Sequence, residues 1–146
     1  MKAPEFVIVL ADDDLDDQLI IKDIFSAHSD VVNVLNVLNG EETLHLLERL
    51  QRKNITPCLV ILDINMPRMN GRDTLLKIRQ NKFMKDIPVV LFSTSNNAAD
   101  KQFAQMQDAT YVTKPFTYVN MEAVVQGFIS MCESEGKRRR QKAAQQ

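Results

Sequence analysis

Acidic side chains, one hydroxyl and one lysine occur at the ends of short apolar segments in this sequence. They are Asp12, Asp13, Asp63, Ser93 and Lys114. Carboxylates that gather at one point repel one another unless a cation or protons intervene. Three of them make a hard-oxygen site that suits Mg²⁺, with water in its other positions. The ammonium and the hydroxyl could then hold the oxygens of a transferring phosphoryl group, with a carboxylate as the nucleophile.

The sequence contains five apolar, β-branched segments, and these residues directly follow four of them. The segments span residues 6–11, 31–37, 59–62, 89–92 and 110–113. Most are short and almost entirely apolar, which is typical of strands that are buried on both faces of a parallel sheet. The second segment is more polar, and this favours an edge strand.

The stretches between these segments have the spacing of amphipathic helices. The first stretch is expected to present one apolar stripe, made of Leu15, Leu19, Ile20, Ile24 and Phe25. Five βα units in succession imply right-handed crossovers and a doubly wound sheet with helices on both faces. Ligands of such sheets bind beyond the carboxyl ends of the strands. The sequence therefore predicts that the acids, the hydroxyl and the lysine meet at one edge of the sheet.

The order of these motifs resembles the receiver domain of two-component response regulators over residues 5–132. The resemblance rests on the acidic pair, on Asp63-Ile64-Asn65-Met66-Pro67 with Gly71, on Ser93-Thr94 and on Lys114-Pro115. It implies an α/β fold of the (βα)5 type: a doubly wound, flavodoxin-like, five-stranded parallel sheet with strand order 2-1-3-4-5. The expected receiver domain spans residues 1–132, and residues 133–146 form a basic tail or a helix extension.

Carried over residue by residue, the resemblance implies the chemistry of the site. Asp63 is the expected phosphoacceptor, which takes a phosphoryl group from a phosphohistidine, and Ser93 and Lys114 assist this step. Mg²⁺ is the expected cofactor. Its expected protein ligands are Asp12, Asp13, Asp63 and the backbone carbonyl of Asn65.

The same resemblance implies a conformational switch. Ser93 and Tyr111 are the expected switch residues, because in the family the aromatic ring turns inward when the hydroxyl moves toward the phosphoryl group. The peptide bond between Lys114 and Pro115 is expected to be cis, a tolerable cost before proline. The expected partners are a sensor histidine kinase or phosphotransfer protein and a downstream protein target. A homodimer is compatible with the family.

Two other classes of function stay open. An aspartyl-phosphate hydrolase of the haloacid-dehalogenase type uses similar groups, but it needs an acid where Asn65 stands, and its acidic pair comes last. A phosphorylation-independent, flavodoxin-like binding module is the second, although the acids after the first strand would repel a flavin phosphate. Each motif is also common by itself, since an acidic run such as Asp14, Asp16 and Asp17 often only caps a helix. Their joint order favours a signalling receiver over an enzyme.

Composition narrows the class of protein further. Hydrophobic residues make up 45% and charged residues 25% of 146 residues, which is typical of one soluble globular domain. No apolar run approaches the roughly 20 residues that span a bilayer, and residues 1–5 are not expected to begin a signal peptide. Cys58 and Cys132 form no framework or metal spacing, so we expect free, buried thiols and a cytoplasmic location.

The net charge of −1 is unevenly distributed along the chain. Five of the 18 basic side chains lie in residues 137–146, which contain no acid, and this leaves 13 basic against 19 acidic side chains elsewhere. An acidic body is a poor match for nucleic-acid phosphates. We therefore expect no DNA-binding domain and no membrane contact. The basic run is expected to be a solvated end of the chain.

Overall fold

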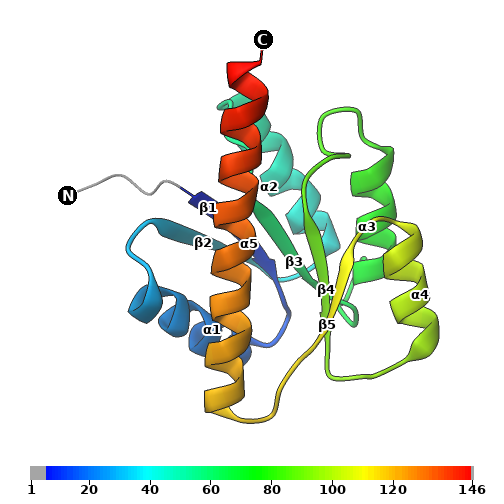
Figure 1. Ribbon diagram of the computed structural model, residues 1–146. Coiled ribbons are helices and arrows are strands. Elements are labelled where there is room, and N and C mark those ends of the chain that lie inside the picture. Colours follow the sequence, from blue (N-terminus) through cyan, green and yellow to red (C-terminus); the bar gives the residue numbers. More distant parts are fainter. Residues whose placement is uncertain (1–5, 146) are drawn as a thin grey trace.

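The computed structural model describes residues 6–145, which form a five-stranded sheet between two layers of helices (Figure 1). The strands are β1 (Phe6–Ala11), β2 (Val32–Val37), β3 (Leu59–Asp63), β4 (Val89–Ser93) and β5 (Thr110–Thr113). The helices are α1 (Leu15–His28), α2 (Gly40–Arg52), α3 (Gly71–Gln80), α4 (Ala98–Met106) and α5 (Tyr118–Ala144). The expectation about residues 1–5 lies outside the described residues.

The strand order is β2-β1-β3-β4-β5, and every neighbouring pair is parallel, as the sequence predicted. β2 lies at one edge, and only Val34 and Val37 of its six residues are buried. β1, β3 and β4 lie inside the sheet, and apart from Phe6, Val7 and Asp63 their residues are buried. Because all strands run in one direction, their carboxyl ends share one edge of the sheet, where the predicted site residues follow.

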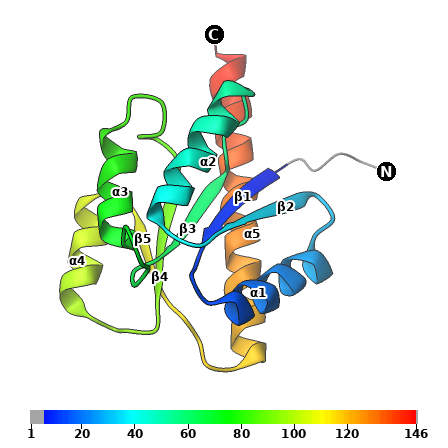
Figure 2. The same ribbon diagram turned by 180° about the vertical axis from the view of Figure 1, so that it is seen from behind.

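Alternate residues of the central strands enter two separate cores. Ile8 and Leu10 pack with residues of α1 and α5, whereas Val9 and Ala11 pack with residues of α2, α3 and α4. The two views show these helix layers on opposite faces of the sheet, with α5 in front in Figure 1 and behind the sheet in Figure 2. Burial on both faces holds β1 and β3 rigidly, and these strands position the acids.

The buried face of α1 differs from the predicted stripe. Three residues of that stripe are exposed: Leu15, Leu19 and Ile20. Gln18 is buried instead, and its side-chain amide donates to the carbonyl oxygens of Asp12 at 2.6 Å and Val37 at 2.7 Å. These two hydrogen bonds fix the rotation of α1 about its axis. An apolar pattern cannot reveal them, because the residue that makes them is polar.

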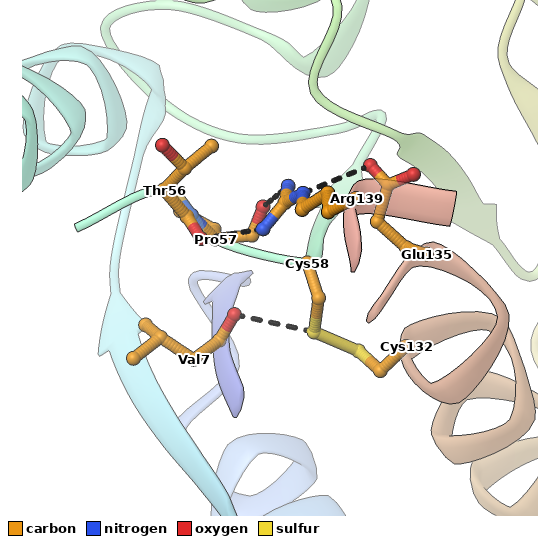
Figure 3. The surroundings of a disulfide bond; sticks show 7 residues. All are labelled: Val7, Thr56, Pro57, Cys58, Cys132, Glu135 and Arg139. Carbon is orange, nitrogen blue, oxygen red and sulfur yellow. Dashed lines mark hydrogen bonds and ion pairs between the residues drawn. A yellow bond between two sulfur atoms is a disulfide. The ribbon is translucent and has the colours of Figure 1, made fainter. Parts of the chain in front are cut away.

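The two cysteines are joined, so the prediction of free thiols is wrong. Cys58, directly before β3, and Cys132, in α5, form a disulfide across a sequence separation of 74 residues (Figure 3). The fold packs α5 over β3, and this proximity is absent from the spacing of the cysteines in the sequence. The expectation of a reducing compartment rested on free cysteines, so the cysteines no longer support it.

α5 continues through the basic end of the chain. The helix runs from Tyr118 to Ala144, so residues 133–144 extend it rather than forming a frayed tail. Within residues 6–145, none of the helices combines the length and the apolar character that crossing a membrane requires.

Candidate functional site

Three carboxylates meet beyond the carboxyl ends of β1 and β3, as predicted. One oxygen from each of Asp12, Asp13 and Asp63 lies within 4.8 Å of the other two. Asp12 is buried, Asp63 is partly buried and Asp13 is exposed. Hard oxygen ligands at this spacing, open to water on one side, fit a divalent cation such as Mg²⁺ or Mn²⁺.

Lys114 follows β5, and its ammonium lies among the carboxylates. Its Nζ is 2.6 Å from an oxygen of Asp12, 3.3 Å from one of Asp17 and 3.6 Å from one of Asp63. Burial lowers the pKa of Lys114, but the hydrogen bond to Asp12 and the charges of Asp12, Asp63 and Asp17 together outweigh this effect, and the pKa lies above its usual value. The ammonium is therefore charged at neutral pH.

The peptide bond between Lys114 and Pro115 is trans, which contradicts the prediction of a cis bond, and no cis bond occurs within residues 6–145. Trans is the lower-energy isomer before proline by about 0.5–1 kcal/mol. The Lys114 side chain reaches Asp12 from this isomer, so contact with the acids does not require the cis form.

Asp17 is also a site residue, although its place in the acidic run predicts only a role in capping the first helix. Asp14 supplies the cap, because its side chain accepts hydrogen bonds from the N–H groups of Asp16 and Asp17. The Asp17 carboxylate instead faces Lys114. Its position one helical turn after Asp13 is the only signal in the sequence for this contact.

A tight loop after β3 holds Asp63 in place. The N–H of Asn65 donates to the Asp63 side chain at 3.4 Å, and the N–H of Gly71 donates to the carbonyl of Ile64 at 2.9 Å. A Cβ atom on Gly71 would lie 2.3 Å from the carbonyl oxygen of Asp63. Only glycine therefore allows α3 to begin so close to the strand.

The Asp63 carboxyl is a weaker acid than an ordinary aspartate. Burial raises its pKa from 3.8 to about 6, the charge of Lys114 opposes this effect, and the charges of Asp12 and Asp13 add to it. At neutral pH the group is mostly ionised. Below about pH 6, protons compete with a cation for the carboxylate.

This raised pKa predicts a pH-dependent stability. Because the unfolded chain ionises Asp63 at a lower pH than the folded chain, the free energy of unfolding should fall as pH rises from 3.8 to about 6. Asp63→Asn should remove this fall and stabilise the metal-free protein at pH 7 by about 1–2 kcal/mol, a value discounted for partial exposure. Urea unfolding of both proteins in a chelator, across this pH range, measures the difference. A difference that does not change with pH would contradict the assignment.

Ser93 is the last residue of β4, and Tyr111 lies on β5. The hydroxyl of the buried Ser93 accepts a hydrogen bond from the N–H of Ser95 at 3.1 Å. The hydroxyl of Tyr111 donates to the carbonyl of the same Ser95 at 2.5 Å. Both predicted switch residues thus contact one residue of the β4–α4 loop, and neither of these hydrogen bonds reaches the acids.

The arrangement of acids and lysine at the ends of these strands can be compared with known proteins. The sequence profile of the response regulator receiver domain family matches residues 8–126. The chain belongs to this family. The predictions of a receiver domain, of its fold and of a signalling role are therefore confirmed.

The receiver is similar over most of its length to other response regulators. It is 28% identical over 130 residues to response regulator Rcp1 of Synechocystis sp. PCC 6803, covering 87% of this chain and 88% of Rcp1. The Mn²⁺-bound form of Rcp1 superposes with a TM-score of 0.75 at 28% identity, over 86% of this chain and 92% of that one. The phosphorylated cyanobacterial phytochrome response regulator RcpA gives 0.77 at 30% identity, over 85% and 91%. The similarity therefore extends over the fold and the segments that carry the acids.

Proposed function

We propose that Asp63 accepts a phosphoryl group from a phosphohistidine on a sensor histidine kinase or a phosphotransfer protein. One observation carries the proposal: the buried ammonium of Lys114 lies within ion-pair distance of both Asp12 and Asp63. Asp63 is the last residue of the central strand β3. In this step an Asp63 oxygen forms a bond to phosphorus, and the bond from phosphorus to the imidazole nitrogen breaks. The electron pair of that bond stays on the nitrogen, and the imidazole leaves as a neutral group after it takes up a proton.

The groups around Asp63 have separate roles in positioning the phosphoryl group and in neutralising its charge. We assign Mg²⁺ to the acidic cluster, with Asp12, Asp13, Asp63 and the carbonyl of Asn65 as its ligands. When bound, this ion supplies positive charge at a site where carboxylates would otherwise repel the phosphoryl oxygens. Lys114 holds one phosphoryl oxygen through its ammonium, and Ser93 donates its hydroxyl hydrogen to another.

The phosphoryl group then operates a switch. Its new charge draws the hydroxyl of Ser93 away from the N–H of Ser95, which changes the loop that also accepts the hydrogen bond of Tyr111. The Tyr111 ring is then released to turn inward. This movement alters the surface of α4, β5 and α5, which we propose as the face that meets a downstream protein or a second receiver. A kinase donor would place the protein in the cytoplasm.

Intact mass spectrometry tests the phosphoacceptor directly. We expect a small-molecule phosphodonor to give one phosphoryl adduct in the presence of Mg²⁺ and none in a chelator or in Asp63→Asn. Asp73→Asn, an exposed aspartate on α3, is the matched control and should be phosphorylated as wild type. No adduct on wild type would overturn the phosphoacceptor role in favour of a constitutive binding module. Rapid consumption of the donor without an adduct would point to an aspartyl-phosphate hydrolase.

The surface around the site supports a protein donor. Large apolar side chains are exposed on α1, on the connection that leads into α5 and at the start of α5: Leu15, Leu19, Ile20, Phe116, Tyr118 and Val119. Phe116 is 89% exposed and lines a small cavity of about 150 Å³ together with Asp17, which contacts Lys114. A protein that delivers a phosphoryl group to Asp63 must cover these exposed side chains.

Phe116→Ala should therefore separate two kinds of donor. We expect phosphotransfer from a phosphohistidine protein to slow by roughly tenfold, since an aromatic contact at an interface is worth about 1–2 kcal/mol. Phosphorylation by a small-molecule donor should not change, because the site itself is intact. Phe83→Ala is the control, because Phe83 is 63% exposed but precedes β4, at the opposite end of the strands. Equal slowing with both kinds of donor would show that Phe116 supports the site rather than the docking surface.

A further inference from the structure

The last turns of α5 continue well past the part of the chain that matches the family. The match ends at residue 126, whereas α5 runs to Ala144. Residues 133–144, called the α5 extension below, span about 18 Å at 1.5 Å per residue. They carry Lys137, Arg138, Arg139, Arg140 and Lys142. The extension is therefore the most basic part of an otherwise acidic protein.

Apolar packing of α5 becomes sparse where the extension begins, although Gly136 in the extension still lies against the ring of Phe6. The buried residues of the helix are Met121, Val125, Phe128, Cys132 and Glu135, and the last of these is charged. Two cavities, of about 430 and 410 Å³, are lined by the extension and by the segment before β4, and both include Pro88, Glu135 and Arg138. About twelve residues of helix with so little apolar contact are not stable alone. The extension must therefore depend on contacts near its start.

Those contacts gather around the Cys58–Cys132 disulfide (Figure 3). Arg139 donates to the carbonyl oxygens of Thr56 at 3.0 Å and Pro57 at 2.7 Å, directly before the cysteine that precedes β3. Its Nε also lies 3.3 Å from a carboxylate oxygen of Glu135. Arg139 is only partly buried, so these polar contacts contribute little by themselves. The covalent bond is the strongest link between the start of the extension and the sheet.

The disulfide is buried, and Cys58, which is only 2% exposed, is the cysteine that borders a cavity. Cys58 lines a cavity of about 310 Å³ together with Phe6, Thr56 and Arg139, whereas Cys132 has no exposed surface. The Cys58 sulfur lies 3.4 Å from the carbonyl oxygen of Val7, where a free thiol would donate its hydrogen. Cys58 is thus the cysteine nearer to the cavity, and its sulfur keeps a hydrogen-bond partner when reduced.

We propose that Cys58 and Cys132 form a reversible redox site that fastens the α5 extension when oxidised and releases it when reduced. The reaction partner is an anionic low-molecular-weight thiol and its disulfide, because Arg139 places positive charge at the cavity. In oxidation, the Cys58 thiolate attacks the small disulfide and expels one thiolate. The Cys132 thiolate then attacks the Cys58 sulfur and expels the second. Two electrons pass to the small disulfide, and its two thiolates take up the two protons; reduction is the reverse.

The test uses the full-length chain in buffers rich in glutathione disulfide or in glutathione. Intact mass and alkylation report the thiol state, and hydrogen exchange and limited trypsin digestion report the extension. We expect the amides of residues 134–140 to exchange roughly tenfold faster or more in the reduced form, with rapid cleavage at Lys137–Arg140. The amides of β3 and β4 should remain protected in both forms.

Cys58→Ser/Cys132→Ser is the matched variant, and its extension should exchange and be cleaved at the reduced rate in both buffers. Because this variant also changes two buried side chains, reduced wild type provides the independent comparison. Three results would overturn the proposal. The first is a thiol state that does not change with the ratio of glutathione to glutathione disulfide. The second is an extension whose amides are equally protected in both forms. The third is a loss of protection on reduction that occurs in the extension and in the strands together.

Discussion

Replacing Lys114 by methionine is expected to slow phosphorylation of Asp63 by a small-molecule donor by roughly 10²–10³-fold, the usual loss when one preorganised donor to a transferring group is removed. The variant keeps the carboxylates and the volume of the side chain but loses the ammonium. Without it, a phosphoryl oxygen meets Asp12, Asp17 and Asp63 with one positive charge fewer. Time-resolved mass spectrometry at saturating Mg²⁺ measures the rate.

The same substitution is also expected to destabilise the metal-free protein by about 3 kcal/mol, because it leaves the buried carboxylate of Asp12 without its ion pair. Added Mg²⁺ should restore part of this loss. Lys77→Met, on the exposed surface of α3, is the control and should affect neither rate nor stability. A wild-type phosphorylation rate in Lys114→Met would exclude the role proposed for this lysine.

Loss of the disulfide is expected to be the largest purely structural effect. The bond closes a loop with a sequence separation of 74 residues. Loop-closure entropy for about that length is worth roughly 4 kcal/mol, so Cys58→Ser/Cys132→Ser should lower the free energy of unfolding by about that amount. Urea denaturation of the variant and of wild type with and without a reductant measures the effect. Reduced wild type separates loss of the cross-link from changes in packing, and equal midpoints for its two forms would refute the prediction.

The elements that position the acids could be predicted because their signals are local. Short apolar segments identify the strands, and parallel strands bring their carboxyl ends to one edge whatever the details of packing. Asp12, Asp13, Asp63 and Lys114 meet there for that reason. The edge position of β2 was likewise visible in its polarity.

The features that the sequence did not reveal all depend on distant contacts. Gln18 sets the rotation of α1 through carbonyl groups at the ends of two strands. Asp17 faces Lys114 only because of that rotation and because Lys114, which follows the edge strand β5, reaches back to Asp12 at the end of β1. The pairing of Cys58 with Cys132 requires α5 to lie over β3. No pattern of neighbouring residues encodes any of these three contacts.

The convergence of Ser93 and Tyr111 on Ser95 affects what mutational scanning can detect. Both hydrogen bonds use the backbone of Ser95, one its N–H and the other its carbonyl, while its side chain is exposed. Ordinary substitutions at this position leave both bonds possible, so a deep scan would score the residue as tolerant. Only proline, which lacks the N–H, removes one of them. A position that is free to vary in sequence can therefore be the point through which two side chains on neighbouring strands are coupled.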